Sequence, residues 1–494
     1  MERRAAAAGA GLALLLAAAC TTSTTPAPDA APQVTAQPSA QTSAQASPQA
    51  DSRSGGVPTS SATPRRPTGP PPWVDPSATQ PLVLAVNARR PPIDVAPGLA
   101  RRIVRGRVDD WAALGQRGGR LSVTRRTADL RSLPMHVLAV VPAAAVGPGV
   151  RAVDVGGVDP LRMPGRYPLT TGAQAPPPDV TTLTVVGDIM LGRRVGERAA
   201  ASGDPAYPLR PMQGRLAAAD LTVGNLESTL SRDGAPTQGG DSFAADPAVR
   251  AGLRDAGFDA VGLANNHLGD FGDRALMETA ELLRAAGLSP FGAGATPAQA
   301  GRPVVLERNG LRFGFLAFNA IGETPEVGPG QPGAVSVSMP PRTGPLDRGE
   351  LDRFLGSVRR LDHRVDVVTV LPHWGTQYTQ RPEPIQRAVA GELVASGADL
   401  VVGGHPHWVQ GASLRGGALV VHSLGNFVFD MDFMQQTQEG LVLEAVFWGD
   451  RLKAAEFVPY RIGADFAPRV VPYSGAQANL DLFWQFSGIG ASPR

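Results

Sequence analysis

The sequence predicts an α/β protein, and three observations support this prediction. From Thr181 onward, short β-branched runs end abruptly in Gly with Asp, Asn, Glu or His, and helix-like sequence follows each run. Apolar runs bounded by turn signals and alternating with helices are typical of a sheet buried on both faces. The chain has 494 residues, 43% of them hydrophobic, which is enough for a sizeable core in two or three compact units. Its single Cys excludes a disulfide framework, an Fe–S cluster and a Cys-rich zinc module.

Six segments carry this strand pattern: 182–188, 220–227, 259–267, 365–375, 398–407 and 418–427. In open α/β sheets, ligands bind beyond the carboxyl ends of the strands. We therefore expect the polar residues that end these runs to gather at one edge of the fold.

The charge and the aromatic content argue against a nucleic-acid partner. The formal net charge is +2, and Lys453 is the one lysine among 46 basic residues. No basic run is long enough for a nucleic-acid footprint, and an aromatic content of 5% does not suit a base-stacking surface.

Residues 1–20 read as an export signal. Arg3 and Arg4 precede an apolar run that is shorter than the roughly 20 residues a membrane-spanning helix needs. Cys20 follows three alanines, and this resembles a bacterial lipoprotein signal in which that Cys becomes the lipidated N-terminus. A plain secretory signal with a stray Cys is the alternative, and Ala17 favours it, because Leu is commoner there in lipoproteins.

The rest of the chain divides by composition. Residues 21–79 are rich in Thr, Ser, Ala, Pro and Gln and predict a disordered linker. Residues 80–174 predict a small accessory α/β domain, and their order of segments resembles part of a phosphate-type periplasmic solute-binding domain. A phosphate-sensing role for this region is a further hypothesis. The main domain is expected over residues 181–470 and a tail over 471–494, while the Pro/Gly-rich segment 320–350 predicts a functional flap or local disorder.

The histidines point to a metal site. Five of the seven lie at or just before the ends of the strand-like runs, and Asp188, Glu227 and Asn266 hold equivalent positions. Imidazole, carboxylate and amide oxygen suit one or two divalent ions of the Mn, Fe or Zn class. Without thiolates a structural zinc knot is excluded, and the mixed ligand set suits a site that keeps open positions for water and substrate. The five histidines are His267, His373, His405, His407 and His422.

Six motifs in order resemble those of the CapA family, which is associated with poly-γ-glutamate capsule synthesis and belongs to the calcineurin-like metallophosphatase superfamily. They are GDIMLGR (187–193), GNLEST (224–229), ANNHLGDFG (264–272), HWGTQY (373–378), GGHPHWVQG (403–411) and HSLGNFVFD (422–430). The resemblance spans roughly residues 181–440 and implies a metallophosphatase-like α/β/β/α sandwich.

The resemblance also implies roles for single residues. Asp188 corresponds to the first-strand aspartate on one metal, and Glu227 to a bridging carboxylate. Asn266 and His373 are implied as ligands, His405 and His407 as a pair with one on each metal, and His267 as the general acid or anion stabiliser. Arg193 is expected to meet a phosphate or carboxylate. Asn225 and Asn426 are expected to bind substrate or, alternatively, to support turns.

Two positions depart from the family pattern. Met190 stands where the superfamily usually has the His of Asp-x-His, so the first metal lacks one ligand. Gln377 stands where the CapA pattern often has Glu. We do not expect His422 to be a ligand, and Trp374 and Trp408 are expected to pack against the site wall.

Two functions follow as expectations. The first is a lipid-anchored, extracytoplasmic, metal-dependent hydrolase, held at the outer face of the cell membrane, that acts on a phosphoester or a γ-glutamyl or acyl substrate. The second is a non-catalytic component that binds an anionic polymer during its export. Capsule-synthesis membrane proteins are expected partners of either.

Overall fold

The structure, a computed structural model, describes residues 79–490. The expected export signal, lipidation at Cys20 and almost all of the expected linker lie outside the described residues. Within residues 79–490, no helix has both the length and the apolar character needed to cross a bilayer.

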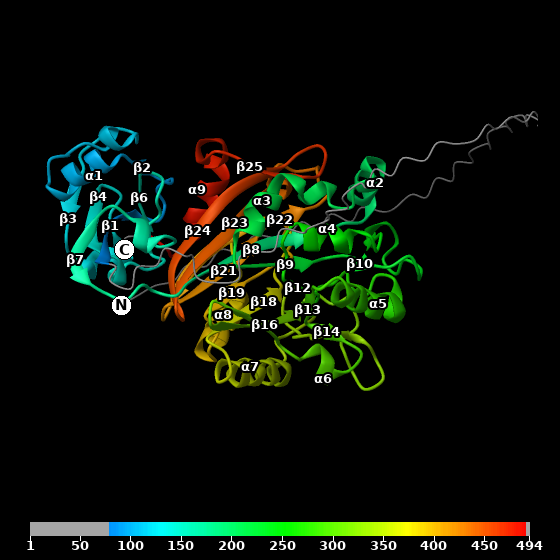
Figure 1. Ribbon diagram of the computed structural model, residues 1–494. Helices are drawn as coiled ribbons and strands as arrows, with labels where there is room; N and C mark the ends of the chain where they lie inside the picture. The colour runs from blue at the N-terminus through cyan, green and yellow to red at the C-terminus, as the bar shows by residue number, and fades with distance from the viewer. Residues whose placement is uncertain (1–78, 491–494) are drawn as a thin grey trace, which may run out of the picture. The chain divides into compact units, whose positions relative to one another are not determined.

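Two mixed sheets form the main part of the fold (Figure 1). In the first, β8, β9, β12 and β13 are parallel, β22 pairs in parallel with β8, and β23, β24 and β25 continue the sheet in antiparallel fashion. Its strands are β13 (Ser289–Phe291), β12 (Ala260–Gly262), β9 (Leu221–Leu226), β8 (Val180–Ile189), β22 (Asn426–Val428), β23 (Glu439–Trp448), β24 (Arg451–Ile462) and β25 (Pro468–Val470).

In the second sheet, β16, β18, β19 and β21 are parallel, and β15 and β20 pair antiparallel at the two edges. Its strands in order are β15 (Val304–Arg308), β16 (Leu311–Asn319), β18 (Val367–His373), β19 (Leu400–Val402), β21 (Ala418–Leu424) and β20 (Val409–Arg415). The six strand-like segments of the sequence therefore all contain strands.

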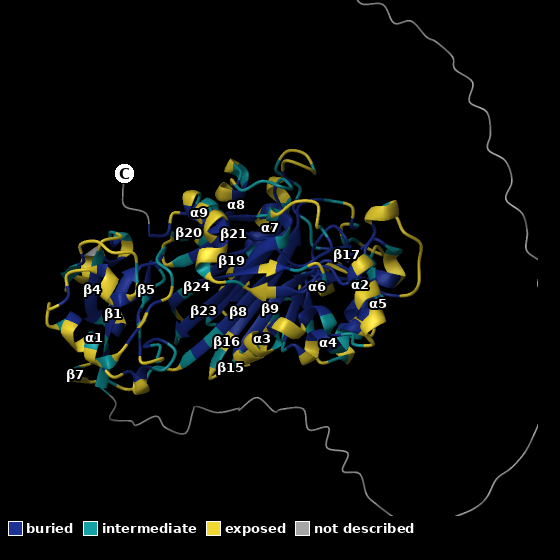
Figure 2. Cartoon of the chain, turned by 90° about the horizontal axis from the view of Figure 1, so that it is seen from above, coloured by how far each residue is buried: buried dark blue, intermediate teal, exposed yellow. Residues whose placement is uncertain are grey.

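Helices cover the outer faces of both sheets, and the two sheets share a core. Leu183 and Val223 of the first sheet and Phe315 and Val421 of the second belong to one buried cluster. Burial of each such side chain contributes about 1.5–3 kcal/mol. In Figure 2 the central strands of the two sheets are dark blue, and the helices carry the yellow of exposed residues. The α/β/β/α sandwich is thus confirmed.

Two helical layers complete the sandwich. Leu216, Leu253 and Leu276 pack on the first sheet, and Leu351 and Val389 pack on the second. The helices on the first sheet are α2 (Arg193–Ser202), α3 (Gln213–Ala218), α4 (Val249–Asp255) and α5 (Gly272–Ala285); those on the second are α7 (Arg348–Asp362) and α8 (Pro384–Ala395).

Local sequence sets where the second pair of helices begins. The Asp347 carboxylate caps α7 by accepting from the Glu350 backbone N–H, and α8 begins at Pro384 behind a capping box formed by Glu383 and Gln386. The short elements are α6 (Pro297–Ala300) and the strand pairs β10 (Thr229–Leu230) with β11 (Ala244–Ala245) and β14 (Ala293–Gly294) with β17 (Gly333–Ala334). Thus β17 and the first residues of α7 occupy part of segment 320–350.

Residues 79–174 form a separate sheet with its own apolar cluster, which includes Leu84, Ile103, Trp111 and Leu138. The elements are β1 (Thr79–Asn87), β3 (Ser122–Thr124), β4 (Val137–Pro142), β5 (Val150–Ala152), β7 (Thr170–Gln174), the pair β2 (Asp94–Val95) and β6 (Asp154–Val155), and helix α1 (Pro97–Val104).

The C-terminal residues expected as a tail contain helix α9 (Gln477–Gln485). Leu480, Phe483 and Trp484 of this helix are buried in the cluster that the two main sheets share. The spacing of these three residues places them on one face of a helix.

Candidate metal centre

The carboxyl ends of the parallel strands bring the predicted ligands together. Asp188 is the next-to-last residue of β8, and Glu227 follows β9 directly; Asn266 and His267 follow β12. His373 ends β18, and His405 and His407 follow β19. All of these side chains are buried.

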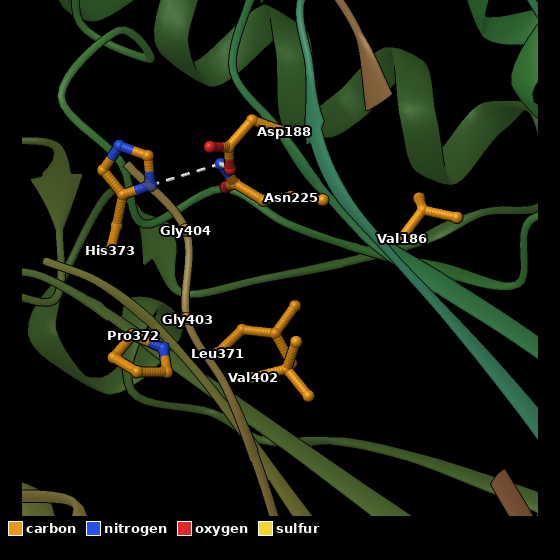
Figure 3. Close-up of a pocket in the computed structure, with 10 residues that line it drawn as sticks. Val186, Asp188, Asn225, Leu371, Pro372, His373, Val402, Gly403 and Gly404 are labelled. Atoms are coloured by element: carbon orange, nitrogen blue, oxygen red, sulfur yellow. Dashed lines mark hydrogen bonds between the residues drawn. The ribbon is translucent and has the colours of Figure 1, made fainter. Parts of the chain in front are cut away.

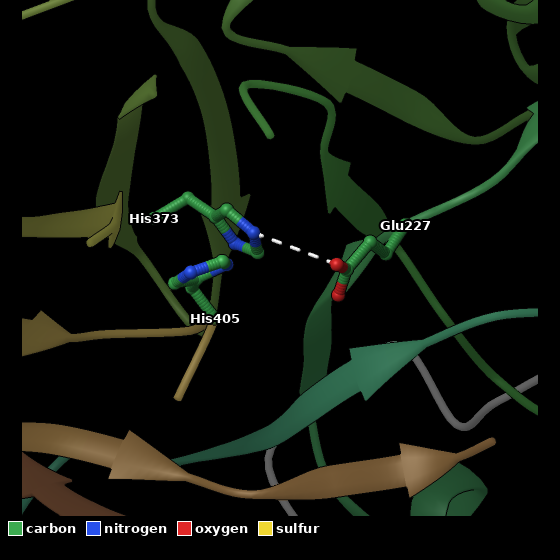
Figure 4. A group of neighbouring side chains, drawn as sticks. All are labelled: Glu227, His373 and His405. Atoms are coloured by element: carbon green, nitrogen blue, oxygen red, sulfur yellow. Dashed lines mark ion pairs between the residues drawn. The ribbon is translucent and has the colours of Figure 1, made fainter. Parts of the chain in front are cut away.

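Glu227, His373 and His405 form one group that can hold a metal ion (Figure 4). One potential ligand atom from each lies within 4.8 Å of the others, and His373 Nε2 is 3.6 Å from Glu227 Oε1. Asn266 joins this group because its Oδ1 is 2.8 Å from His373 Nε2. The structure thus gathers four residues that the family resemblance implied as metal ligands.

Asp188, Glu227 and His407 form another such group, again with ligand atoms within 4.8 Å of one another. Glu227 is common to both groups, which is the arrangement expected of a bridging carboxylate. His405 and His407 fall in different groups, as the resemblance implied. Both have positive φ values, 92° and 57°, so the backbone is strained where the two imidazoles enter the site.

The donor set fits a cation because several buried polar atoms have no other partner. Both carboxylate oxygens of Glu227 and both ring nitrogens of His405 are buried without a hydrogen-bond partner. Buried polar atoms are rarely left unpaired, and an isolated buried carboxylate is costly. Burial raises the pKa of Glu227 to about 8 and that of Asp188 to about 7. A divalent cation would stabilise both carboxylates in their ionised form.

The histidines are held in the neutral form that binds metal. Burial lowers the pKa of His373 to about 4 and that of His407 to about 3, and it lowers the pKa of His405 well below its ordinary value. Neutral imidazole nitrogens offer a free lone pair to a cation.

Asn225 and Asn426 lie behind the ligands. Asn225 Nδ2 donates to Asp188 Oδ1 (2.8 Å), and its Oδ1 accepts from Asn265 (3.0 Å). Asn426 Oδ1 is 2.8 Å from His407 Nδ1, and its Nδ2 donates to the Thr437 carbonyl (3.0 Å). With both ends of each amide occupied inside the protein, these side chains are placed to orient the candidate ligands, and the expected contact with substrate stays a prediction.

A small cavity lies beside Asp188 and His373, which belong to different groups (Figure 3). Its volume is about 10 Å³, room for about one water molecule, and Asp188, Asn225 and His373 line it. Figure 3 shows the Asn225 amide between the other two side chains, 3.3 Å from His373 Nδ1. Asn225 therefore links a ligand of one group to a ligand of the other.

His267 is held in place by two neighbouring side chains, those of Asp270 and Phe243. Its Nδ1 is 2.8 Å from Asp270 Oδ2, and its ring stacks on Phe243 with centroids 3.7 Å apart. Its Nε2 is 3.9 Å from Glu227 Oε1, at the edge of the metal-binding groups. Asp270 lies three residues after His267 in the same motif, so that spacing was an available signal; nothing in the sequence pattern marks Phe243.

Arg193 lies near the candidate ligands and is separated from His267 by the Phe243 ring. Its guanidinium pairs with Asp430 and lies 4.4 Å from the centre of the Phe243 ring, whose neighbour is His267. The side chain is 26% exposed, which leaves it accessible to an anionic group.

The other residues considered in the sequence, Met190, Trp374, Trp408 and His422, pack against neighbouring side chains. Met190 is fully buried in an apolar cluster and offers no nitrogen or oxygen ligand. Trp374 is fully buried, and Trp408 is partly buried, 6.3 Å from the Tyr378 ring. His422 belongs to neither metal-binding group; its ring stacks near Trp374, and its Nδ1 has no hydrogen-bond partner.

Fold and site together define the class: an α/β/β/α sandwich with two groups of buried side chains that could each hold a metal ion, joined by one carboxylate, at the carboxyl ends of its strands. A family model described as bacterial capsule synthesis protein PGA_cap matches residues 182–431. The chain belongs to this family, and the resemblance to CapA is confirmed.

Named relatives agree with this assignment. The capsule biosynthesis protein CapA of Bacillus anthracis is 33% identical over 267 residues, 53% of this chain and 62% of the relative. The PGA biosynthesis protein CapA of Bacillus subtilis (strain 168) is 27% identical over 268 residues, 53% of this chain and 67% of the relative. The chain thus spans about three fifths of the length of the Bacillus anthracis protein.

Among solved structures, a hypothetical protein from Thermus thermophilus aligns with a TM-score of 0.36 and 18% identity, over 57% of this chain and 99% of that one.

Proposed function

We propose that this protein is a metal-dependent hydrolase of the cell envelope that acts on an anionic polymer of the poly-γ-glutamate kind or on a phosphoester. One observation carries the proposal: Glu227 and His405 are buried with all their side-chain acceptor and donor atoms unpaired, within ligand distance of each other. Such an arrangement is costly unless a cation completes it.

The ligands divide between two positions. Asp188, Glu227 and His407 would hold a cation at the first position. Glu227, Asn266, His373 and His405 would hold one at the second. Divalent ions of the Mn, Fe or Zn class supply Lewis-acid chemistry and lower the pKa of bound water.

His267 is the residue placed to transfer a proton. The Asp270 carboxylate also accepts from the Phe243 backbone N–H (2.7 Å) and from Gln238 Nε2 (2.5 Å), so it acts as an acceptor towards His267 Nδ1–H. The imidazole therefore presents Nε2 towards the ligand groups, where it can give a proton to a leaving group.

The substrate class rests on charge and on the relatives. Arg193 is the partly exposed cation beside the His267 and Phe243 stack, and its guanidinium suits a carboxylate or phosphate. The Bacillus relatives are named for capsule and PGA biosynthesis, and we extend that role to this chain.

We place the protein outside the cytoplasm, tethered by a lipid on Cys20 to the outer face of the membrane. The support is the sequence of residues 1–20, in which Cys20 follows a charged and then an apolar segment and three alanines. Mass spectrometry of the mature N-terminus tests this placement: a lipidated Cys20 supports it, and an unprocessed Met1 contradicts it.

The catalytic proposal is tested with purified full-length protein. Elemental analysis should find bound divalent metal, and hydrolysis of bis(p-nitrophenyl) phosphate and of γ-linked glutamate oligomers should require it. His267→Ala should lose turnover by about 10²-fold or more while keeping its metal. Absence of metal in the wild-type protein, or turnover unchanged in the variant, contradicts the proposal.

A second candidate is a non-catalytic component that binds an anionic polymer. It is favoured by Met190, which leaves the first group without the usual Asp-x-His ligand. On this alternative, poly-γ-glutamate binds to the wild-type protein and is recovered uncut, and Arg193→Ala weakens that binding. Release of shorter fragments rejects the alternative.

A further inference from the structure

The first metal position is one ligand short. Asp188, Glu227 and His407 supply three groups, and Met190 supplies none. Met190 lies in an apolar cluster, and its Sδ accepts the Gly192 backbone N–H at 3.1 Å. The side chain is therefore engaged elsewhere, and another residue must complete this position if it is to match the second.

The hydrogen bonds around His407 indicate which of its ring nitrogens has a free lone pair. Asn426 Nδ2 donates to the Thr437 carbonyl, so its Oδ1 is the atom that faces His407 Nδ1. That oxygen can only accept, which places the imidazole proton on Nδ1 and leaves the lone pair on Nε2. His407 Nε2 is thus the atom available to a cation.

Gln377 is the neighbour of that atom. Its side-chain amide nitrogen lies 3.5 Å from His407 Nε2, which is long for a hydrogen bond between two nitrogens. Two atoms bound to one cation at about 2.1 Å each stand about 3.4 Å apart in a tetrahedral site. A half-turn of the amide exchanges its nitrogen and its oxygen, so the oxygen can take this place.

The backbone keeps Gln377 beside His407. The next residue, Tyr378, donates its backbone N–H to the Pro406 carbonyl at 2.9 Å, and Pro406 directly precedes His407. Tyr378 has a positive φ of 59°, so the loop is held in a strained conformation at this contact. A residue other than glycine in that conformation indicates that the position of the loop is tightly determined.

We propose that the Gln377 side-chain oxygen is the fourth protein ligand of the first metal position and replaces the ligand that Met190 cannot provide. This inference rests on the metal centre proposed above. Each position then has four protein ligands: the shared Glu227 carboxylate, one amide oxygen, from Gln377 or Asn266, and two further groups. Because Gln377 is neutral, the first position holds its cation less tightly than it would with a carboxylate there.

Titration of Mn²⁺ into metal-stripped full-length protein tests the inference without any assay of activity. Gln377→Ala and the similarly shaped Gln377→Met should weaken one binding step by about tenfold or more. Gln377→Glu should strengthen the same step, so a loss of folding cannot imitate the pattern. Gln380→Ala, in the same loop, is the matched control and should leave both steps unchanged.

A second variant assigns the step to a position. His405→Ala removes a ligand of the second position alone, so it should weaken the other step, and the double variant with Gln377→Ala should lose both. If the Gln377 variants leave every step unchanged, or weaken the step that His405→Ala weakens, the inference is overturned and the metal centre stands. If the wild-type protein binds no Mn²⁺, Zn²⁺ or Fe²⁺, both the metal centre and the inference are overturned.

Discussion

The Asp270 carboxylate holds the His267 imidazole across 2.8 Å and fixes which of its nitrogens faces the metal-binding groups. Asp270→Asn replaces one carboxylate oxygen by an amide donor and should allow the other tautomer or ring orientation. We expect kcat for a phosphodiester to fall by about 10²-fold with metal content unchanged. Steady-state kinetics together with elemental analysis measure both quantities.

Asp273→Asn is the matched control for this prediction, because Asp273 is exposed three residues further along and contacts Gln331 instead. A kcat for Asp270→Asn equal to that of this control would show that the contact does not serve His267.

The shared carboxylate predicts an asymmetry between two ligand substitutions. Glu227→Ala removes a ligand from both groups and should abolish binding of both cations, whereas His405→Ala should spare one. His422→Ala is the control, since His422 is a buried histidine in neither group and its loss should lower stability without lowering the metal stoichiometry. Equal stoichiometry in Glu227→Ala and His405→Ala would contradict a bridging role.

Gly404 is required by the close packing of the two sheets at the site. A Cβ at this residue would lie 2.4 Å from Asp188 Oδ1 and 3.2 Å from His373 Nδ1. Gly404→Ala should therefore displace ligands of both groups, weaken metal binding and lower stability by about 1–3 kcal/mol. Gly214→Ala, at an exposed position of helix α3 with open space around it, should leave metal binding unchanged. Denaturant unfolding and metal titration of the pair check this prediction.

The sequence was sufficient to predict the strands that lead to the site and most of the candidate ligands, because both follow from local patterns. Each of the six segments contains a strand, and polar residues at strand ends meet wherever parallel strands share an edge. The pattern could not say which strands share a sheet, since pairing such as that of β22 with β8 joins segments far apart in the chain.

Side-chain contacts between residues far apart in the chain could not be predicted from the sequence. Phe243 lies in a loop 24 residues before His267, and only the folded chain stacks the two rings. His422 shows the converse: it resembles the other strand-end histidines, but β21 continues to Leu424, so the imidazole lies inside the strand, near Trp374. The motifs predict Asn225 and Asn426 as site residues, but their burial behind the candidate ligands follows from tertiary structure alone.

The buried carboxylates predict how pH affects the metal-free protein. Glu227 and Asp188 have pKa values raised to about 8 and about 7 by burial, from 4.5 and 3.8. A raised carboxyl pKa means that the folded state binds the proton more tightly, so stability falls as pH rises from the ordinary value to the folded one. The histidines have the opposite effect on stability. Burial lowers their pKa values from 6.5 to about 4 for His373 and about 3 for His407, so stability rises with pH over that interval and no longer changes on their account above about pH 6.5.

Between about pH 6.5 and pH 8, therefore, the carboxylates dominate, and the Tm of the metal-stripped protein should fall as pH rises. Asp154, whose pKa is raised to about 7 mainly by burial, also lowers the Tm as pH rises. A variant is therefore needed to separate the part of the Tm change that comes from Glu227. Glu227→Gln should flatten the decline, and saturating Mn²⁺ should reverse it in the wild-type protein, because ionised ligands bind the cation better. A Tm that is independent of pH over this interval without metal, or equally steep in Glu227→Gln, would mean that Glu227 is not the unpaired buried acid that the structure shows.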